Sequence, residues 1–422
     1  MSAIQQPLVL PCGETIPNRI CKAAMTEGIA NIHDQPTDKH QVLYQQWSEG
    51  GAGLLISGNV MVDRRYLERA GNVVIEQGAD LSPIKDWTAA ATKNGNQFWA
   101  QISHPGRQCP RLVNLTPVSP SDVQLHMVGN FGKPKPLTET EIDNIITRFA
   151  TTAKLCKEGG FTGVQIHSAH GYLLSQFLSP HTNRREDKWG GTLENRARLL
   201  LTIIRVVREQ VGDDFPIAVK LNSSDFQKGG FSHEDSVQVA KWLSEAGIDL
   251  LEVSGGTYEQ VSFLSREDEK DVRESTKQRE AFFLQYAESM RKAVGDLPLM
   301  ITGGFRTLSV MNEATEEGKT DMIGFGRPFC MVPDFPNKLF NGDLDSLPKP
   351  ESNLVLGTGI LGANSKNGLF KAINVQGQAG YFYYQIYKLA NGKLPKYNLG
   401  VFESFYKHIS RDWYKSIIRK LA

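Results

Sequence analysis

Cysteine is scarce in this chain of 422 residues, and its placement does not suit the usual structural roles. The sequence has five cysteines, an odd number, scattered without a C-x-x-C pair. This pattern excludes a disulfide framework and a thiolate metal cluster. We therefore expect no metal centre and a protein of the reducing cytoplasm.

Long apolar runs and a surplus of charge are missing as well. No stretch of about 18 apolar residues is present, so we expect no membrane-spanning helix. Residues 1–20 do not show a basic segment followed by an apolar one, as a secretion signal would. The formal net charge is only +1, which argues against a nucleic acid as the partner.

Short apolar runs that alternate with helical stretches fill most of the chain. Runs bounded by glycine, proline or polar turns predict parallel strands buried on both faces. They cover residues 19–25, 53–58, 97–103, 163–167, 217–222, 250–254, 299–302 and 322–326. This alternation predicts an α/β fold, a (β/α)8 TIM barrel, over residues 1–348. The number of strands alone leaves a doubly wound open sheet as the alternative.

The intervening helices carry start and stop signals. Thr138 and Glu141 form a capping box, and Gly159 and Gly160 end the helix that follows. Further helices are expected at residues 193–210, 232–246, 279–294 and 308–317. The long connections at 104–137 and 255–279 are typical of loops that build the mouth of a barrel.

The composition changes after Pro348. Residues 349–422 hold eleven lysines and arginines against three acidic residues, together with the aromatic runs 380–387 and 402–406. We expect a helical, basic and aromatic C-terminal extension. Such a segment packs on its own barrel, covers the mouth, contacts a neighbouring subunit of a homo-oligomer or touches an anionic membrane surface. Packing on the barrel or a subunit is favoured over a membrane.

The densest signal lies in residues 166–196, which begin where the fourth strand ends. His167 and His170 are three residues apart, and Tyr172 follows two residues later. A short turn would aim all three side chains into the mouth of the barrel. Two imidazoles can stabilise the enolate-like charge that grows on a carbonyl oxygen, and the phenol can supply a proton to carbon. A metal pair and ordinary hydrogen-bonded surface histidines are the alternatives.

Residues 166–196 resemble the active-site segment of the Old Yellow Enzyme family, the flavin-dependent ene-reductases. The match includes LLSQFLSP at 173–180, NRR at 183–185, GG at 190–191 and ENR at 194–196. The resemblance extends over about residues 5–340. It implies FMN as cofactor, His167 and His170 as the residues that bind the substrate's activating group, and Tyr172 as the proton donor.

The resemblance also implies which backbone segments contact the flavin ring. Ala24, Met25 and Thr26 stand where the family lays backbone and a Thr or Cys against the flavin. Thr26 would hydrogen-bond near flavin O4, and Gly58 stands where backbone approaches the ring. Without the resemblance, Thr26 is equally a plain hydroxyl at the end of a strand.

Two further residues match flavin-binding positions. Gln101 matches a glutamine that hydrogen-bonds the pyrimidine edge of the isoalloxazine, and Lys220 matches a position that usually holds Arg beside flavin N1 and O2. Lysine keeps the charge that stabilises an anionic reduced flavin but loses the fork geometry. A core amide and a lysine that reaches the surface are the alternative interpretations.

The residues themselves, apart from the resemblance, indicate a phosphate-binding site. Gly303 and Gly304 follow the seventh strand, and Gly326 and Arg327 follow the eighth. Barrels commonly bind phosphate in these two loops, because glycines permit close backbone approach and Arg pairs with phosphate. A plain turn is the alternative for each glycine pair. The family binds the FMN phosphate with similar GG and GR pairs.

The sequence also departs from the family. Ser103 stands where some members carry Trp, and Gly28 where some have a Tyr that contacts substrate. Tyr258 is a candidate replacement for that contact, and a packing role in its loop is the alternative. The cysteines that hold an iron–sulfur cluster in longer relatives are missing, which argues against that subtype.

The resemblance implies an FMN-dependent oxidoreductase that works by a ping-pong hydride transfer. NADH or NADPH would reduce the flavin, and an α,β-unsaturated carbonyl or nitro compound would then be reduced at its carbon–carbon double bond. The alternatives are an NADH oxidase or flavin reductase that uses oxygen or quinone, and a flavin-binding module without turnover. A metal hydrolase is disfavoured because no carboxylate lies at ligand spacing from the two histidines.

Overall fold

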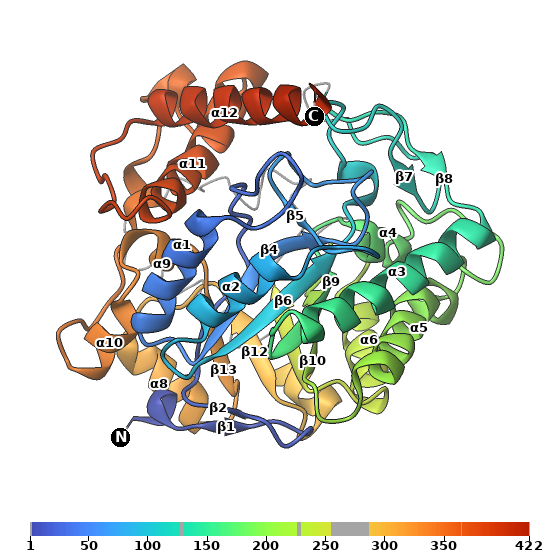
Figure 1. Cartoon of the computed structure of the whole chain (residues 1–422), viewed down its shortest axis with the longest axis horizontal. Coiled ribbons are helices and arrows are strands. Elements are labelled where there is room, and N and C mark those ends of the chain that lie inside the picture. Colours follow the sequence, from blue (N-terminus) through green and yellow to red (C-terminus); the bar gives the residue numbers. More distant parts are fainter. Residues whose placement is uncertain (1, 127–129, 226–228, 255–286, 364, 422) are drawn as a thin grey trace.

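The computed structural model describes residues 2–126, 130–225, 229–254, 287–363 and 365–421. Within these residues, eight parallel strands close into a barrel (Figure 1). In order around the ring they are β3 (Ile20–Lys22), β4 (Leu54–Met61), β6 (Gln97–Ser103), β9 (Gly163–Ser168), β10 (Ile217–Asn222), β11 (Leu250–Ser254), β12 (Leu299–Thr302) and β13 (Met322–Phe325). β3 pairs with both β13 and β4, so the ring of eight strands is closed. The predicted barrel is confirmed, and the open sheet is excluded.

The strands are buried because both of their faces are covered. The barrel interior is filled by side chains from alternate strand positions, among them Cys21, Trp99 and Met300. An N-terminal hairpin, β1 (Leu8–Val9) with β2 (Thr15–Ile16), packs on this interior cluster and closes the bottom of the barrel (Figure 1). The mouth is therefore at the opposite end, where the strands finish.

The helices surround the barrel as their apolar stripes require. They include α1 (Asp38–Glu49), α2 (Ser82–Ala91), α3 (Glu139–Glu158), α5 (Leu193–Val211), α6 (His233–Glu245) and α8 (Leu308–Glu316). The capping box at the start of α3 is present, with Thr138 and Glu141 bonded reciprocally. Residues 287–294 are helical. The remainder of the helix predicted at 279–294, the loop at 255–279 and Tyr258 lie outside the described residues.

Two strands end three residues away from the predicted position. β4 continues to Met61 because Asn59–Met61 pair with Gln101–Ser103 after a register shift that follows Ile56. The short strand β5 (Val73–Val74) pairs with the end of β4, at Val60 and Met61. β3 is only three residues long, since its ladders to β13 and β4 involve Ile20–Lys22 alone. Ala24 and Met25 therefore follow the strand instead of ending it.

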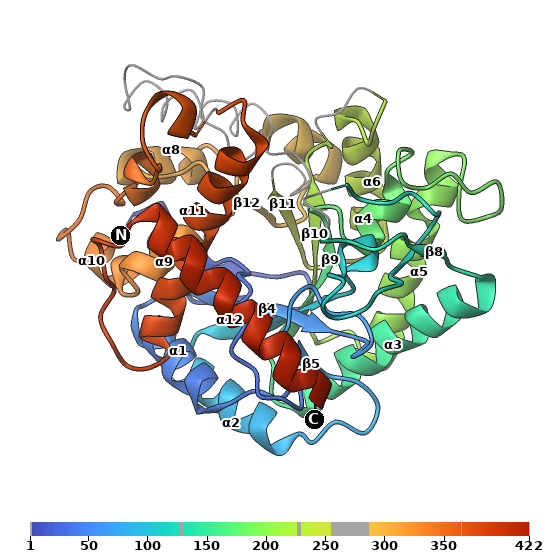
Figure 2. The same cartoon turned by 90° about the horizontal axis from the view of Figure 1, so that it is seen from above.

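The extension is helical, as expected. After α9 (Arg327–Met331), α10 (Phe335–Phe340), η4 (Pro350–Asn353) and η5 (Gly359–Leu361), it forms α11 (Gly368–Leu389) and α12 (Val401–Leu421). α11 packs against α9 and α1, and Gln46 of α1 donates a 2.8 Å hydrogen bond to the Leu389 carbonyl. α12 lies above the mouth side of the barrel, near β4 and β5 (Figures 1 and 2). No helix of the described residues is long and apolar enough to cross a lipid bilayer.

Candidate active site

The turn after β9 gathers the three residues of the predicted catalytic set. His170 has a φ of 62°, a left-handed conformation that is strained for a non-glycine residue. Two hydrogen bonds hold it there: Gln108 Nε2 donates to the His170 carbonyl and His170 N–H donates to Asn222 Oδ1, each over 2.9 Å. The turn then leads into α4 (Leu173–Leu178), with Tyr172 at its N-cap.

This turn brings His167, His170 and Tyr172 together. The ring centroid of His167 lies 5.1 Å from that of His170 and 4.9 Å from that of Tyr172, and both ring pairs are nearly perpendicular. The residues are 2%, 7% and 5% exposed. The interpretation as surface histidines is therefore excluded, and the three polar tips share one small region at the end of β9.

Hydrogen bonding and burial determine how the histidines are protonated. The Ala169 N–H donates to His167 Nδ1 over 3.2 Å. In a neutral ring the proton must therefore be on Nε2, which makes Nε2 a donor. Burial lowers the pKa of His167 well below its usual value, and the nearby His170 and Lys220 lower it further. Burial and Lys220 lower the pKa of His170 in the same way. Both imidazoles are neutral at physiological pH.

Lys220 lies on β10 beside this pair and is fully internal. Its side chain is 4% exposed, and its Nζ is 2.8 Å from Oε1 of Glu252, which is 0% exposed. The strand register sets Lys220 opposite Glu252 on β11 and opposite His167 on β9. Gln165 Nε2 donates to the other carboxylate oxygen of Glu252 over 2.7 Å. Lys220 is therefore a buried cation and not a lysine that reaches the surface.

Gln101 occupies the neighbouring strand, β6. Its Nε2 donates to Asn59 Oδ1 over 2.8 Å, and it is 3% exposed. Its Oε1 is buried without a hydrogen-bond partner among the described residues. Thr26 is less open to a ligand, because its hydroxyl donates to Glu68 over 2.7 Å. The predicted bond from Thr26 to flavin O4 stays a prediction.

A network behind Gly58 was not foreseen from the sequence. The Gly58 N–H donates to Glu27 Oε1 over 2.8 Å, and the Tyr44 hydroxyl donates to the same carboxylate oxygen. Lys22 Nζ donates to the Tyr44 hydroxyl over 3.2 Å and is fully buried. A Cβ on Gly58 would lie 2.6 Å from the Met25 carbonyl oxygen, so only glycine fits. A lysine inside the apolar run at 19–25 and a glutamate two residues after it were the available signal.

The loops after β12 and β13 form the opposite side of the mouth, three and four strands from β9 around the ring. Gly303 and Gly304 have φ of 96° and 84°, a left-handed conformation suited to glycine. Gly326 is the N-cap of α9, which begins with Arg327. The Arg327 guanidinium lies 3.2 Å from the Glu351 carboxylate, which also contacts Arg306 at 3.1 Å.

The residues present fit an FMN molecule across this mouth. The buried oxygens Gln101 Oε1 and Thr302 Oγ1 have no hydrogen-bond partner among the described residues, and such groups normally have one. The two left-handed glycines and Arg327 supply amides and a cation for a phosphate. The His167–His170 pair, Gln101 and Lys220 come from three adjacent strands on the other side.

A closed barrel with hydrogen-bonding groups on one side of its mouth and a glycine-lined anion site on the other is the architecture of FMN-dependent oxidoreductases. The sequence profile of the NADH:flavin oxidoreductase / NADH oxidase family matches residues 4–345, and the chain belongs to this family. The predicted membership in the Old Yellow Enzyme family is confirmed, and with it FMN as cofactor and a reduced nicotinamide as reductant.

Individual relatives agree with this family. The NADH-dependent flavin oxidoreductase iliE of Hypocrea jecorina is 36% identical over 358 residues, which cover 80% of this chain and 89% of that protein. The NADH-dependent flavin oxidoreductase nadA of Aspergillus parasiticus is 37% identical, with 81% and 80% covered. Among solved structures, the old yellow enzyme homologue from Zymomonas mobilis has a TM-score of 0.70 at 28% identity and covers 82% of this chain and 94% of that chain.

Proposed function

We propose that this enzyme reduces the activated carbon–carbon double bond of α,β-unsaturated carbonyl or nitro compounds in a ping-pong reaction. The observation that carries this proposal is the convergence of two neutral, buried imidazoles and a phenol after β9, with ring centroids 5.1 and 4.9 Å apart. NADH is the favoured reductant, since the two fungal relatives are named for it.

FMN, when bound, supplies hydride transfer from the reduced nicotinamide to the double bond. Its binding residues, in this proposal, lie on both sides of the mouth. The ring side comprises Ala24, Met25, Thr26, Gly58, Gln101 and Lys220, and the phosphate side comprises Gly303, Gly304, Gly326 and Arg327. The buried cation of Lys220 favours negative charge on whatever lies beside it.

The two histidines hold the oxygen of the substrate. His167 Nε2–H is available as a donor because Nδ1 already accepts from the Ala169 N–H. Negative charge that develops on the substrate oxygen is stabilised by these donors in a site of low dielectric. The donors remain neutral, so substrate binding does not depend on a protonated histidine.

Tyr172 supplies the proton that completes the reduction. Its O–H bond breaks as a C–H bond forms at the carbon next to the activating group, and the phenolate that remains is reprotonated from solvent. An ordinary phenol has a pKa near 10, so the proton is held until negative charge has developed on the substrate.

Tyr172→Phe tests this assignment. We expect the half-reaction with cyclohexenone to slow by about 100-fold or more, while reduction of the flavin by NADH stays within about threefold. Anaerobic stopped-flow spectroscopy would follow bleaching by NADH and recolouring by cyclohexenone. Molecular oxygen serves as a control oxidant that needs no proton from Tyr172.

Two outcomes would contradict the proposal. If both half-reactions slowed equally in Tyr172→Phe, the proton-donor role would be wrong. If oxygen recoloured the wild-type flavin while enones and nitroalkenes did not, the enzyme would be an NADH oxidase instead.

The surrounding assignments are part of the same proposal. Residues 1–348 form the FMN-binding unit, and residues 349–422 form an extension that packs on it. The five cysteines are free, four of them buried, as suits a reducing cytoplasm. The substrate is a small molecule, and no nucleic acid is involved.

A further inference from the structure

Helix α12 lies on the mouth side of the barrel with its charged side turned inward. Lys415 Nζ donates to the Gly28 carbonyl over 2.7 Å, which helps to set the rotation of the helix about its axis. The aromatic side chains on the other side of the helix are more than half exposed: Phe402, Tyr406 and Trp413. Charged residues of α12 therefore meet the loops at the mouth.

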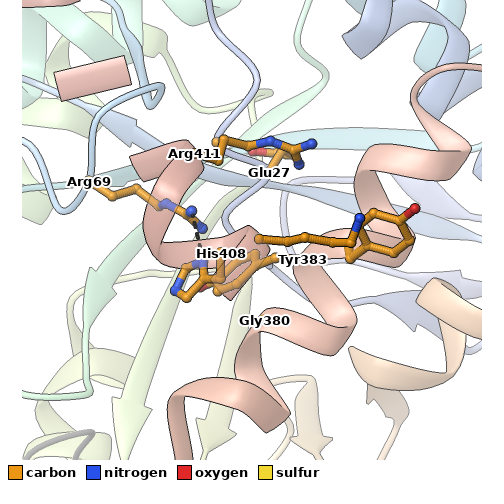
Figure 3. Close-up of a pocket in the computed structure, with 9 residues that line it drawn as sticks. Glu27, Arg69, Gly380, Tyr383, His408 and Arg411 are labelled. Atoms are coloured by element: carbon orange, nitrogen blue, oxygen red, sulfur yellow. Dashed lines mark hydrogen bonds between the residues drawn. The ribbon is translucent and has the colours of Figure 1, made fainter. Parts of the chain in front are cut away.

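A small cavity lies where α11 and α12 meet these loops (Figure 3). Glu27 and Gly28 follow β3, and Arg69 follows β4, so these residues form the barrel wall of the cavity. The helical wall includes Tyr383, Tyr384, Lys407, His408 and Arg411. Among the described residues, three cations and one carboxylate line the cavity, which favours a negatively charged occupant.

Arg69 is buried, yet part of its guanidinium has no partner. Its side chain is 9% exposed, and its Nη2 donates to the Asp412 carboxylate. Its Nε and Nη1 are buried without a hydrogen-bond partner among the described residues. A buried donor that stays unpaired costs about 1–3 kcal/mol, and such donors normally have an acceptor. An oxyanion in the cavity would supply that acceptor.

The neighbours of Arg69 hold its guanidinium in place. The guanidinium lies 4.1 Å from the Tyr383 ring centroid, and its Nη2 lies 3.4 Å from His408 Nδ1 (Figure 3). A Cβ on Gly28 would lie 3.2 Å from Arg69 Cζ, so the guanidinium fills the space of a side chain at position 28. The group is therefore fixed before a ligand arrives, which lowers the entropy lost on binding.

The surrounding carboxylates do not neutralise the cations. Glu27 is already engaged in the network behind Gly58, where its Oε1 accepts a hydrogen bond from the Gly58 N–H over 2.8 Å. Burial, followed by Arg69 and Arg411, lowers the pKa of Lys415 to about 8. Positive groups in this region thus repel one another, and a bound anion would relieve that repulsion.

The cavity adjoins the ring side of the mouth. Glu68, which precedes Arg69, accepts a hydrogen bond from the Thr26 hydroxyl over 2.7 Å. Glu27, in the cavity wall, is bonded to Gly58. Thr26 and Gly58 belong to the ring-binding residues proposed above. A ligand that lies over the ring therefore has one end close to Arg69.

We propose that Arg69, Lys407 and Arg411 bind an oxyanion, the carboxylate or phosphate group of a ligand held in the mouth. The extension thereby takes part in ligand recognition. The cavity is small, so an entering group displaces the Lys407 side chain, which is 38% exposed and lies 3.5 Å from Glu403. NADH carries a suitable group in its pyrophosphate, and an acidic enone carries one in its carboxylate. Only the enone as source rests on the proposed function.

Titration of the FMN-loaded chain with inorganic phosphate tests the site directly, because the cofactor then fills its own phosphate site. Calorimetry at constant ionic strength should show saturable binding in the wild type. Arg69→Gln should weaken it about tenfold or more, since charge-assisted hydrogen bonds are lost. Asp412→Asn breaks the same ion pair but keeps the guanidinium and removes a competing carboxylate. It should tighten binding, by about threefold.

Substitutions on α12 test the contribution of the extension. Lys407→Gln and Arg411→Gln should each weaken phosphate binding about threefold or more. Lys420→Gln is the matched control, because Lys420 lies on the same helix, is exposed and is not part of the cavity wall. It should bind phosphate as the wild type does. Far-UV circular dichroism and the flavin spectrum report that each variant is folded and holds FMN.

Two matched pairs of compounds identify the source of the oxyanion. Anaerobic stopped-flow spectroscopy compares NADH with N-benzyl dihydronicotinamide, which has no phosphate, and benzoylacrylate with its methyl ester. If the pyrophosphate is the source, Arg69→Gln weakens binding of NADH about tenfold more than that of the phosphate-free compound. If the carboxylate is the source, the same contrast separates the acid from the ester.

The proposal fails if the wild type shows no saturable phosphate binding or if Arg69→Gln binds phosphate equally well. Equal weakening by Arg69→Gln and Asp412→Asn would show that Arg69 only anchors α12. Phosphate binding without a contrast in either pair of compounds would separate the cavity from the mouth and also refute the proposal. If neither the acid nor the ester recolours the wild-type flavin, the proposed function is wrong, while phosphate and NADH still test the site.

Discussion

At the scale of single residues, a buried ion pair lies beside the candidate site. Lys220 and Glu252 face one another at 2.8 Å with almost no exposure. Transfer of either charge from water alone is expensive, and the pair persists because each neutralises the other and Gln165 satisfies the second carboxylate oxygen. The same cation helps to keep His167 neutral.

Lys220→Met would therefore leave Glu252 buried without its counter-charge. We expect the free energy of unfolding to fall by about 3–5 kcal/mol. Urea denaturation of the apoprotein, followed by tryptophan fluorescence, measures this loss. The double variant Lys220→Met/Glu252→Gln removes both charges and should recover most of the stability. A single variant as stable as the wild type would show that the pair is not buried in solution.

At the scale of elements, the contact between α11 and α12 depends on two small residues. A Cβ on Gly377 would lie 2.6 Å from the Val401 carbonyl oxygen, and a Cβ on Gly380 would lie 2.6 Å from that of Ser404. Glycine in a helix interior is normally unfavourable, by about 1 kcal/mol relative to alanine. Here it permits the close approach of α12 to α11.

Gly380→Ala should therefore destabilise the protein, by about 1–3 kcal/mol, although alanine is the better helix former. Gly368→Ala in the same helix is the control, since a Cβ there meets no atom within 4 Å. It should be neutral or stabilising. Thermal unfolding gives the difference, and limited trypsin digestion reports whether α12 has loosened. Equal effects of the two substitutions would contradict the packing argument.

At the scale of the whole molecule, buried histidines make the fold sensitive to acid. Burial lowers the pKa of His40 to about 3 and those of His104 and His408 to about 4, against 6.5 for a free side chain. His40 and His104 lie in the barrel and His408 lies in the extension. Below pH 6.5 these histidines bind protons in the unfolded chain but stay neutral in the folded chain. The free energy of unfolding therefore falls as the pH falls.

His408→Gln should reduce this sensitivity. Each such histidine lowers the free energy of unfolding by about 1.4 kcal/mol for every pH unit by which the pH falls between 6.5 and the pKa of that histidine in the folded protein. Between pH 7 and pH 4.5 we expect the variant to lose about 2 kcal/mol less stability than the wild type. Urea denaturation of both proteins at pH 7 and pH 4.5 measures this difference. Equal losses of stability in the variant and the wild type would contradict this argument.

The barrel was predictable because its signals are local. Each strand is a short apolar run between turn residues, and parallel strands buried on both faces require that pattern whatever the surroundings. The β4 strand differed from the prediction because its continuation to Met61 depends on pairing with β6 after a register shift. The candidate site was found through a motif of fixed spacing, His167 to Tyr172, within one turn. The network of Lys22, Glu27, Tyr44 and Gly58 was missed because three separate segments form it: β3 with the residues after it, α1 and β4.

The sequence by itself determined the class of fold, the grouping of His167, His170 and Tyr172 in the turn after β9 and the helical nature of the extension. In each case neighbouring residues along the chain set the outcome. Only the tertiary structure decided that Lys220 meets Glu252 and that α12 turns its aromatic side to water. Both depend on contacts between segments far apart in sequence, such as Lys415 with Gly28, and periodicity shows that a helix has two sides without showing which side docks.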